Sequence, residues 1–124
     1  LNQDKSLKKI TLIGHSYGGI LVTQLLKDWN LSTPIDIHVI ASPLLGTPML
    51  NSMCAYEPIS AIPKKSVLYE WRTQFQLDNV FKNLNEDPQR IELNGSLVTT
   101  LPDTYKGNRL GHNWSISWVA DEAF

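Results

Sequence analysis

Apolar and polar positions divide the first part of the chain into short alternating segments. Residues 9–13 (KITLI) form a β-branched and apolar run with the length of a buried strand, and residues 35–41 (IDIHVIA) form another after Pro34. Apolar side chains recur at helical spacing over residues 18–29, namely Ile20, Leu21, Leu25, Leu26 and Trp29. This part of the chain therefore predicts a strand, an amphipathic helix and a second strand.

Two further strands are expected in the second half. Residues 66–76 alternate between apolar and polar positions, which predicts a half-buried third strand with one face formed by Val67, Tyr69, Trp71, Thr73 and Phe75. A turn of helix is expected over residues 78–85, before Pro88. Residues 90–93 are expected to form a fourth strand, and residues 96–100 either pair back as a hairpin or lead into a loop.

The remaining segments complete an alternating order of strands and helices. Residues 113–124 carry Trp114 and Trp118 four positions apart, which indicates a closing helix. The prolines within residues 48–65 permit only short helical turns. Alternating strands and helices favour an α/β fold, a mainly parallel sheet of about four strands flanked by helices. The length suits one domain over residues 1–124.

Composition and net charge limit the binding partners and cofactors that the chain is expected to have. The chain is 42% hydrophobic and 19% charged, as in globular proteins. A net charge of −1 gives no electrostatic reason to expect nucleic acid or an anionic membrane surface. Cys54 is the only cysteine, so no internal disulfide forms. No apolar run approaches the roughly 18 residues of a membrane span, and no metal-ligand spacing or phosphate-binding glycine loop occurs. We therefore expect neither a membrane span nor a cofactor.

A serine flanked by glycines joins the first predicted strand to the first helix. Strand, G-x-S-x-G and helix together form the context of a nucleophile elbow, in which the serine occupies a strained turn. Gly14 and Gly18, two residues away on either side, are expected to provide the room. Ser16 would lie at the N-terminus of the helix, where the dipole stabilises developing negative charge. The backbone N–H of Tyr17 would face the substrate oxyanion. A purely structural turn is the alternative.

A serine nucleophile needs a base, usually a histidine, and the chain has three. His15 adjoins the serine, but its side chain would point away, so packing or a local hydrogen bond is expected. His38 lies in the middle of the second strand and is expected to be structural. His112 lies in a loop just before the last helix. By elimination His112 is the expected base, and an ordinary loop histidine is the alternative.

The carboxylate that orients the base has two candidates. If acid and base follow successive parallel strands, a whole strand must lie between them, and a parallel crossover takes about a dozen or more residues. Only eight residues separate Asp103 from His112, and they have the composition of a loop. Asp78 closes the third strand and leaves 33 residues before His112, enough to include the strand expected at 90–93. Asp78 is therefore preferred, with Asp103 as the alternative.

The motif GHSYGG, the later Asp78 and the motif GHN around His112, in that order, resemble the α/β-hydrolase superfamily, lipases and esterases in particular. The resemblance covers nearly the whole chain. Residues 41–48 (ASPLLGTP) look like the loop that lipase-like members carry after the strand that follows the nucleophile. The resemblance implies cleavage of carboxylic esters with lipid-like or small acyl groups. His112 would deprotonate Ser16, an acyl-enzyme would form, and water would release the acid.

The sequence departs from that family ahead of the serine. Members usually have several strands before the nucleophile strand and a second oxyanion N–H from an early loop, and neither is present here. We therefore expect the C-terminal portion of such a domain, with the N-terminal half as its partner and residues 9–13 as a hydrophobic edge. Loss of one oxyanion donor costs about 2.7–4 kcal/mol, so the piece alone would be nearly inactive. An acyltransferase and a non-catalytic remnant or interaction module are the alternatives.

Overall fold

A computed structural model describes residues 6–124, which form an α/β fold around a parallel sheet. The sheet has the order β1-β2-β3-β4, and all three strand pairs are parallel. Its strands are β1 (Ile10–His15), β2 (Ile35–Ile40), β3 (Ser66–Arg72) and β4 (Leu97–Thr100). The helices of the described residues are α1 (Tyr17–Lys27), α2 (Pro48–Cys54) and α3 (Trp114–Ala123). The predicted class and the parallel sheet are confirmed.

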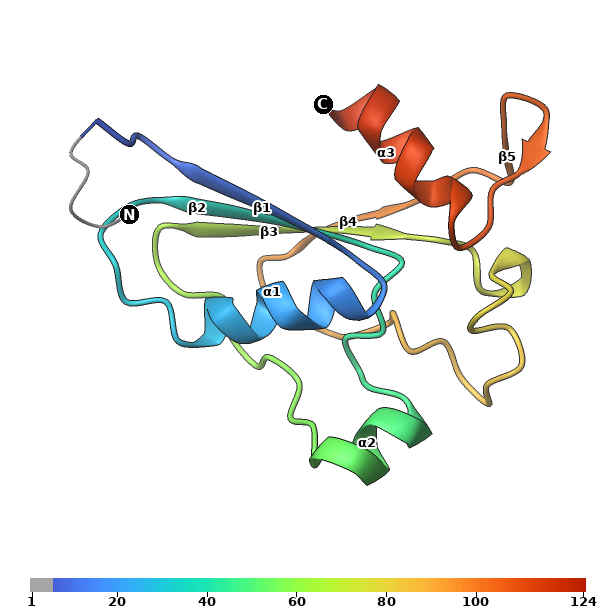
Figure 1. Cartoon of the computed structure of the whole chain (residues 1–124), viewed down its shortest axis with the longest axis horizontal. Coiled ribbons are helices and arrows are strands. Elements are labelled where there is room, and N and C mark those ends of the chain that lie inside the picture. Colours follow the sequence, from blue (N-terminus) through green and yellow to red (C-terminus); the bar gives the residue numbers. More distant parts are fainter. Residues whose placement is uncertain (1–5) are drawn as a thin grey trace.

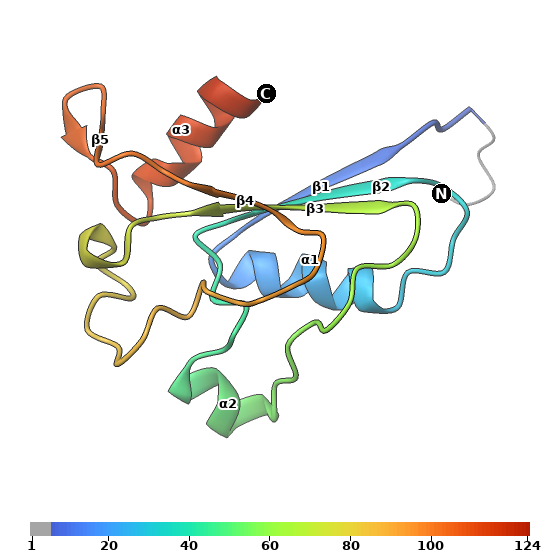
Figure 2. The same ribbon diagram turned by 180° about the vertical axis from the view of Figure 1, so that it is seen from behind.

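Helices lie on both sides of the sheet. Figures 1 and 2 show α1 and α2 on one side and α3 on the other. The core beneath α1 is apolar and includes Ile35, Ile37 and Leu68 from the strands and Leu26 from the helix. A smaller core beneath α3 includes Ile40, Leu101, Leu110 and Val119. Burial of side chains on both faces is typical of parallel sheets, and in β2 five of the six residues are buried, His38 among them.

The fourth strand was predicted at the wrong place. Residues 90–93 do not form a strand, although Ile91 and Leu93 bury their side chains in the core beneath α1. The alternation of polar and apolar residues at 90–93 therefore reflects the burial of Ile91 and Leu93 in a segment that is not a strand. Strand β4 is instead formed by residues 97–100, which pair in parallel with β3 and form no hairpin. All four side chains of β4 are exposed, Leu97 by 52%, so its hydrophobic pattern carried no strand signal.

Strand β3 is shorter than predicted. It ends at Arg72, and residues 75–77 form the 3-10 turn η1 (Phe75–Leu77). The predicted helical turn after Asp78 exists as a set of turns, in which the backbone N–H of Lys82 donates to the Asp78 carbonyl at 2.8 Å. Pairing of β4 with β3 stops at Thr100. The chain therefore leaves the sheet before the alternating pattern ends.

A small hairpin precedes α3 where a loop was expected. Strands β5 (Thr104–Tyr105) and β6 (Asn108–Arg109) pair antiparallel. The residues between them, Lys106 and Gly107, have φ angles of 50° and 78°. Positive φ at both central positions is the requirement of a type I′ turn, whose twist suits a two-residue hairpin. The hairpin returns the chain to the core beneath α3 at Leu110, just before His112.

The edges of the sheet are β1 and β4. On β1, Ile13 exposes 54% of its surface, as expected for an apolar strand that lacks a neighbour on one side. Within residues 6–124, none of the helices has the length and apolar character needed to cross a bilayer.

Candidate functional site

Ser16 occupies a strained turn between β1 and α1. Its backbone has φ 56° and ψ −124°, a region that residues other than glycine rarely adopt. The turn is fixed by two hydrogen bonds: the N–H of Ser16 donates to the Ile40 carbonyl at 2.8 Å, and the N–H of Gly19 donates to the Ser16 carbonyl at 3.0 Å. Ser16 therefore lies at the carboxyl edge of the sheet, where parallel α/β folds bind ligands.

Two glycines let the turn pack closely, but only one of them was predicted for that reason. A Cβ atom on Gly14 would lie 2.4 Å from the carbonyl oxygen of Gly18, so no other residue fits there. A Cβ on Gly18 would meet no atom within 4 Å, and the expectation that Gly18 provides room is wrong for contacts within the protein. Gly19 is the second required glycine, because its Cβ would lie 1.9 Å from the Ser42 hydroxyl.

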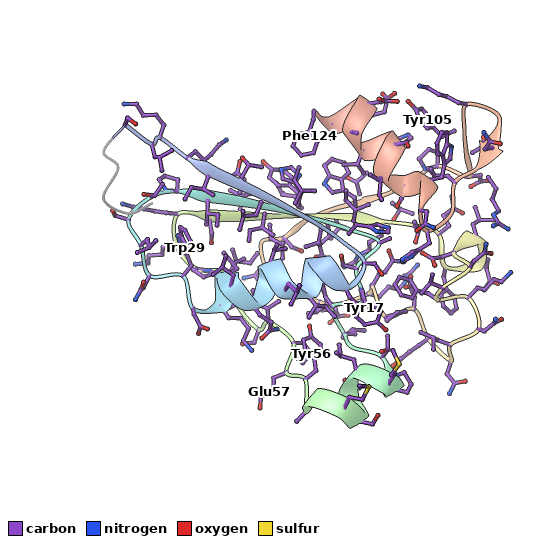
Figure 3. All side chains as sticks on the ribbon, in the orientation of Figure 1. Tyr17, Trp29, Tyr56, Glu57, Tyr105 and Phe124 are labelled. Atoms are coloured by element: carbon purple, nitrogen blue, oxygen red, sulfur yellow. The ribbon has the colours of Figure 1, made fainter. Side chains whose placement is uncertain are left out.

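Tyr17 begins α1, so its backbone N–H has no carbonyl one turn earlier in the helix to accept it. Within the described part of the chain this N–H donates no hydrogen bond. The Tyr17 hydroxyl lies 3.1 Å from the Thr47 hydroxyl, which also accepts the N–H of Leu50 and caps α2. Figure 3 shows Tyr17 at the start of α1, on the side that carries α2. The free N–H lies beside Ser16, where an anion could accept it.

His112 and Asp78 form a buried hydrogen-bonded pair. Nδ1 of His112 lies 2.9 Å from Oδ2 of Asp78, with His112 8% exposed and Asp78 fully buried. Asp78 follows η1, and His112 precedes α3. The glycine before His112 is required: a Cβ on Gly111 would lie 2.8 Å from the Leu77 carbonyl. This close approach brings the loop that carries Asp78 against the loop that carries His112.

Asp78 is held by four donors. Oδ2 accepts the Thr73 hydroxyl at 2.6 Å in addition to His112, while Oδ1 accepts the N–H groups of Val80 at 2.9 Å and Phe81 at 3.1 Å. Burial by itself raises the pKa of Asp78, but the hydrogen bonds from His112 and Thr73 and the backbone outweigh it, and the pKa lies below its ordinary value. Asp78 is therefore ionised at neutral pH, so His112 Nδ1 carries the proton and Nε2 of the neutral ring is an acceptor.

His15 connects the serine turn to the His112 loop. Its Nε2 donates to the His112 carbonyl at 2.9 Å, and the two ring centroids are 4.8 Å apart. Packing or a local hydrogen bond was expected for His15: the packing exists, in the ring contact with His112, but the hydrogen bond is long-range and not local. Burial lowers the pKa of His15, which favours its neutral form. The link holds the backbone of His112 next to the elbow.

The other two candidates lie outside this cluster. His38 stacks on Tyr69 at 4.3 Å between centroids, and its Nδ1 accepts the indole N–H of Trp71 at 3.1 Å, as expected for a structural histidine. Burial lowers the pKa of His38. Asp103 accepts a hydrogen bond from the Gln74 side chain and forms no hydrogen bond or ion pair with His112 among residues 6–124. Of the two acid candidates, the structure brings only Asp78 to His112.

Ser16 and His112 are not hydrogen-bonded to each other in the described part of the chain. A cavity of about 210 Å³ is lined by His112, and another of about 250 Å³ is lined by Thr47, the partner of Tyr17, and Ser16 lines neither. Catalytic hydrogen bonds are often long in the absence of substrate and tighten in the complex. The catalytic roles of Ser16, His112 and Asp78 therefore stay predictions.

Comparisons of the chain with protein-family models, with curated proteins and with solved structures found no match. Function is therefore inferred from the residues at the carboxyl edge of the sheet. Two of those residues, Thr73 and Gln89, were not predicted to belong to a site. The alternating pattern included Thr73 only as part of a strand face, and nothing in the sequence around Gln89 indicated that it reaches the same place.

Proposed function

We propose that this protein is a serine hydrolase of the α/β-hydrolase type that cleaves carboxylic esters with lipid-like or small acyl groups. Ser16 is the nucleophile, His112 the base and Asp78 the carboxylate that orients the base. The observation that supports this most strongly is the buried bond of 2.9 Å between His112 Nδ1 and Asp78 Oδ2, in a loop that His15 ties to the strained turn of Ser16. No cofactor takes part.

The chemistry follows from the protonation of the pair. Ionised Asp78 keeps the proton on Nδ1 of His112, so Nε2 accepts the hydroxyl proton of Ser16 as Oγ attacks the ester carbonyl. The oxyanion accepts the free N–H of Tyr17 at the positive end of α1. His112 then donates its proton to the departing alcohol, which leaves an acyl group on Ser16. Water, deprotonated by His112, attacks the acyl group, and the acid leaves as the proton returns to Ser16.

The proposal includes a partner for the edge strand. The N-terminal half of an α/β-hydrolase domain would pair with β1 and supply the second oxyanion N–H. The apolar edge at Ile13 supports this, because an exposed apolar edge strand pairs readily with another strand. A missing donor costs about 2.7–4 kcal/mol of transition-state stabilisation, which is roughly a 100- to 1,000-fold loss in kcat.

The test is hydrolysis of a small chromogenic acyl ester by the complete protein, with the strands that pair with β1 present, and by its Ser16→Ala variant. The proposal predicts that Ser16→Ala abolishes hydrolysis while Ser60→Ala, a matched control at an exposed serine, keeps the wild-type rate. Hydrolysis that is unchanged in Ser16→Ala would rule out Ser16 as the nucleophile.

A non-catalytic interaction module is the second candidate. It is favoured by one observation, the absence of a hydrogen bond between the Ser16 hydroxyl and His112 in the described part of the chain. An acyltransferase shares every step up to the acyl-enzyme and differs only in the acceptor. A complete protein that hydrolyses no ester and forms no adduct at Ser16 fits the interaction module. An adduct that is released by an alcohol faster than by water fits the acyltransferase.

A further inference from the structure

A row of buried polar side chains extends from Asp78 away from His112. It consists of Thr73, Gln89 and Asp87, which come from the end of β3 and from the loop that was wrongly predicted to lead into a strand. Thr73 is 2% exposed and Gln89 1%. Buried polar groups are costly unless each finds a partner, and within the described residues no buried side-chain nitrogen or oxygen lacks one. The row is therefore a fully bonded network.

The Thr73 hydroxyl is bonded to the oxygen that His112 uses. Its Oγ1 lies 2.6 Å from Oδ2 of Asp78 and 3.3 Å from Oε1 of Gln89. The hydroxyl has one hydrogen, and the carboxylate receives it because that contact is shorter and charge-assisted. Oδ2 of Asp78 is thus fixed by Thr73, while backbone N–H groups fix Oδ1. The carboxylate cannot rotate away from His112 without breaking these bonds.

The Gln89 side chain in turn fixes the backbone of Thr73. Its Oε1 accepts the Thr73 N–H at 3.0 Å, and its Nε2 donates to the Thr73 carbonyl at 3.1 Å. Thr73 is the first residue after β3, where pairing with β4 has ended. The amide therefore takes the place of a neighbouring strand and holds Thr73 by both of its backbone groups.

Asp87 determines which way this amide points. Its Oδ1 accepts both the backbone N–H and the Nε2 of Gln89, each at 3.1 Å. An ionised carboxylate only accepts, so the nitrogen of the amide must face Asp87 and both of its hydrogens are used. The other oxygen of Asp87 pairs with Arg90 at 3.6 Å. In this orientation Gln89 holds both backbone groups of Thr73, an arrangement called the Gln89 clamp below. It is the only orientation that gives each polar group of Thr73, Gln89 and Asp87 a partner.

We propose that Gln89 is a positioning residue for the triad, acting through the backbone and hydroxyl of Thr73 on the Asp78–His112 pair. The inference rests on the proposed hydrolase function. Gln89 is separated from His112 by Thr73 and Asp78, so it affects the geometry of the base and not the binding of substrate. Loss of the clamp therefore lowers kcat and leaves KM unchanged.

Gln89→Met tests this directly, because it keeps the length of the side chain and removes the amide. The exposed Gln76→Met is the matched control. Rates of ester hydrolysis are expressed per folded protein. We expect Gln89→Met to lower kcat about 10- to 100-fold, the scale of small misplacements of catalytic groups, with KM unchanged. Gln76→Met keeps the wild-type kcat. If Gln89→Met does not fold, Gln89→Glu, which keeps an acceptor for the Thr73 N–H but loses the donors to the Thr73 carbonyl and to Asp87, is also expected to lower kcat.

The route through Thr73 is tested by a second set of variants. Thr73→Val removes the hydroxyl and is expected to lower kcat as Gln89→Met does, whereas Thr73→Ser restores it. In the double variant with Thr73→Val, Gln89→Met lowers kcat no further, because both act on one bond. Additive losses would overturn the route through Thr73. A Gln89→Met protein with a lower melting temperature and wild-type kcat would show that Gln89 is structural only.

A measurement that does not depend on catalysis separates the positioning role of Gln89 from the proposed hydrolase function. The Nδ1 proton of His112, observed by ¹⁵N-edited NMR, is expected to be protected from exchange in the wild type, Thr73→Ser and Gln76→Met. In Gln89→Met and Thr73→Val it exchanges rapidly with water. If the wild type hydrolyses no ester but the proton behaves in this way, the hydrolase proposal fails and the positioning of His112 stands. An unchanged proton in Gln89→Met overturns the positioning.

Discussion

Replacing Asp78 with asparagine is the most informative change, because every group around this carboxylate is a donor. His112 and Thr73 donate to Oδ2, and Val80 and Phe81 donate to Oδ1. An asparagine has only one acceptor oxygen. It keeps that oxygen toward the two backbone N–H groups, which cannot reverse, and turns its NH₂ toward Thr73 and His112. The Thr73 hydroxyl can rotate to accept, but His112 can accept at Nδ1 only by moving its proton to Nε2.

The position of the His112 proton determines how far kcat falls in Asp78→Asn. With Nε2 protonated, His112 cannot take the proton of Ser16, and the wrong tautomer lowers kcat in a Ser-His-Asp triad by about 10⁴-fold. That factor corresponds to about 5 kcal/mol of transition-state stabilisation. The fold is expected to lose only about 1–3 kcal/mol, the cost of weakened hydrogen bonds to a charged group. Asp78→Asn is therefore expected to be folded and inactive.

The assay is hydrolysis of the chromogenic ester, with kcat expressed per protein folded by circular dichroism. Asp103→Asn is the matched control, because it makes the same change of charge at the alternative acid, whose side chain contacts Gln74 instead of His112. We expect Asp103→Asn to stay within about threefold of the wild type. An Asp78→Asn protein that keeps kcat within tenfold of the wild type, or an Asp103→Asn protein that loses as much, would refute the reasoning.

Two further predictions concern stability. The folded-state pKa of Asp78 lies below the ordinary value of about 3.9, so its contribution to the free energy of unfolding is complete above that pH and is lost as the pH falls through the folded pKa. Urea unfolding between about pH 7 and pH 3 is expected to show a smaller acid loss in Asp78→Asn than in the wild type, and equal losses would contradict the assigned contacts. Gly19→Ala, whose Cβ would lie 1.9 Å from Ser42 Oγ, is expected to lower stability by about 1–3 kcal/mol. Gly18→Ala, which meets nothing within 4 Å, is expected to raise it by up to about 1 kcal/mol. Thermal unfolding measures both, and a reversed order would contradict the packing of the elbow.

The strands that sequence patterns predicted correctly, β1 and β2, contribute apolar side chains to the core beneath α1, fully buried in β2 and partly buried in β1. Strands β1 and β2 and helix α1 pack into one core, so their apolar spacing follows their geometry. Strand β4 was missed because its side chains face solvent and its strand character comes from backbone pairing with β3 alone. The buried segment 90–93 was mistaken for it because burial without pairing produces the same pattern.

The choice between the two carboxylates followed from topology. The prediction required a whole strand between acid and base, and such a strand exists, although it is β4 and not residues 90–93. Local motifs located the strained turn at Ser16, since strain and close packing there depend on neighbouring residues. The clamp of Gln89 on Thr73 could not be predicted, because it depends on how an irregular loop packs against the end of β3.

The central claim is that Ser16 is a nucleophile activated by His112. It is tested most directly by mass-spectrometric mapping of the adduct formed with a fluorophosphonate probe. The account predicts one adduct, on the peptide that carries Ser16, which forms in the wild type and in Ser60→Ala and is lost in His112→Ala. A complete protein with intact Ser16 that forms no adduct, or an adduct at Ser16 that forms equally fast in His112→Ala, would contradict it.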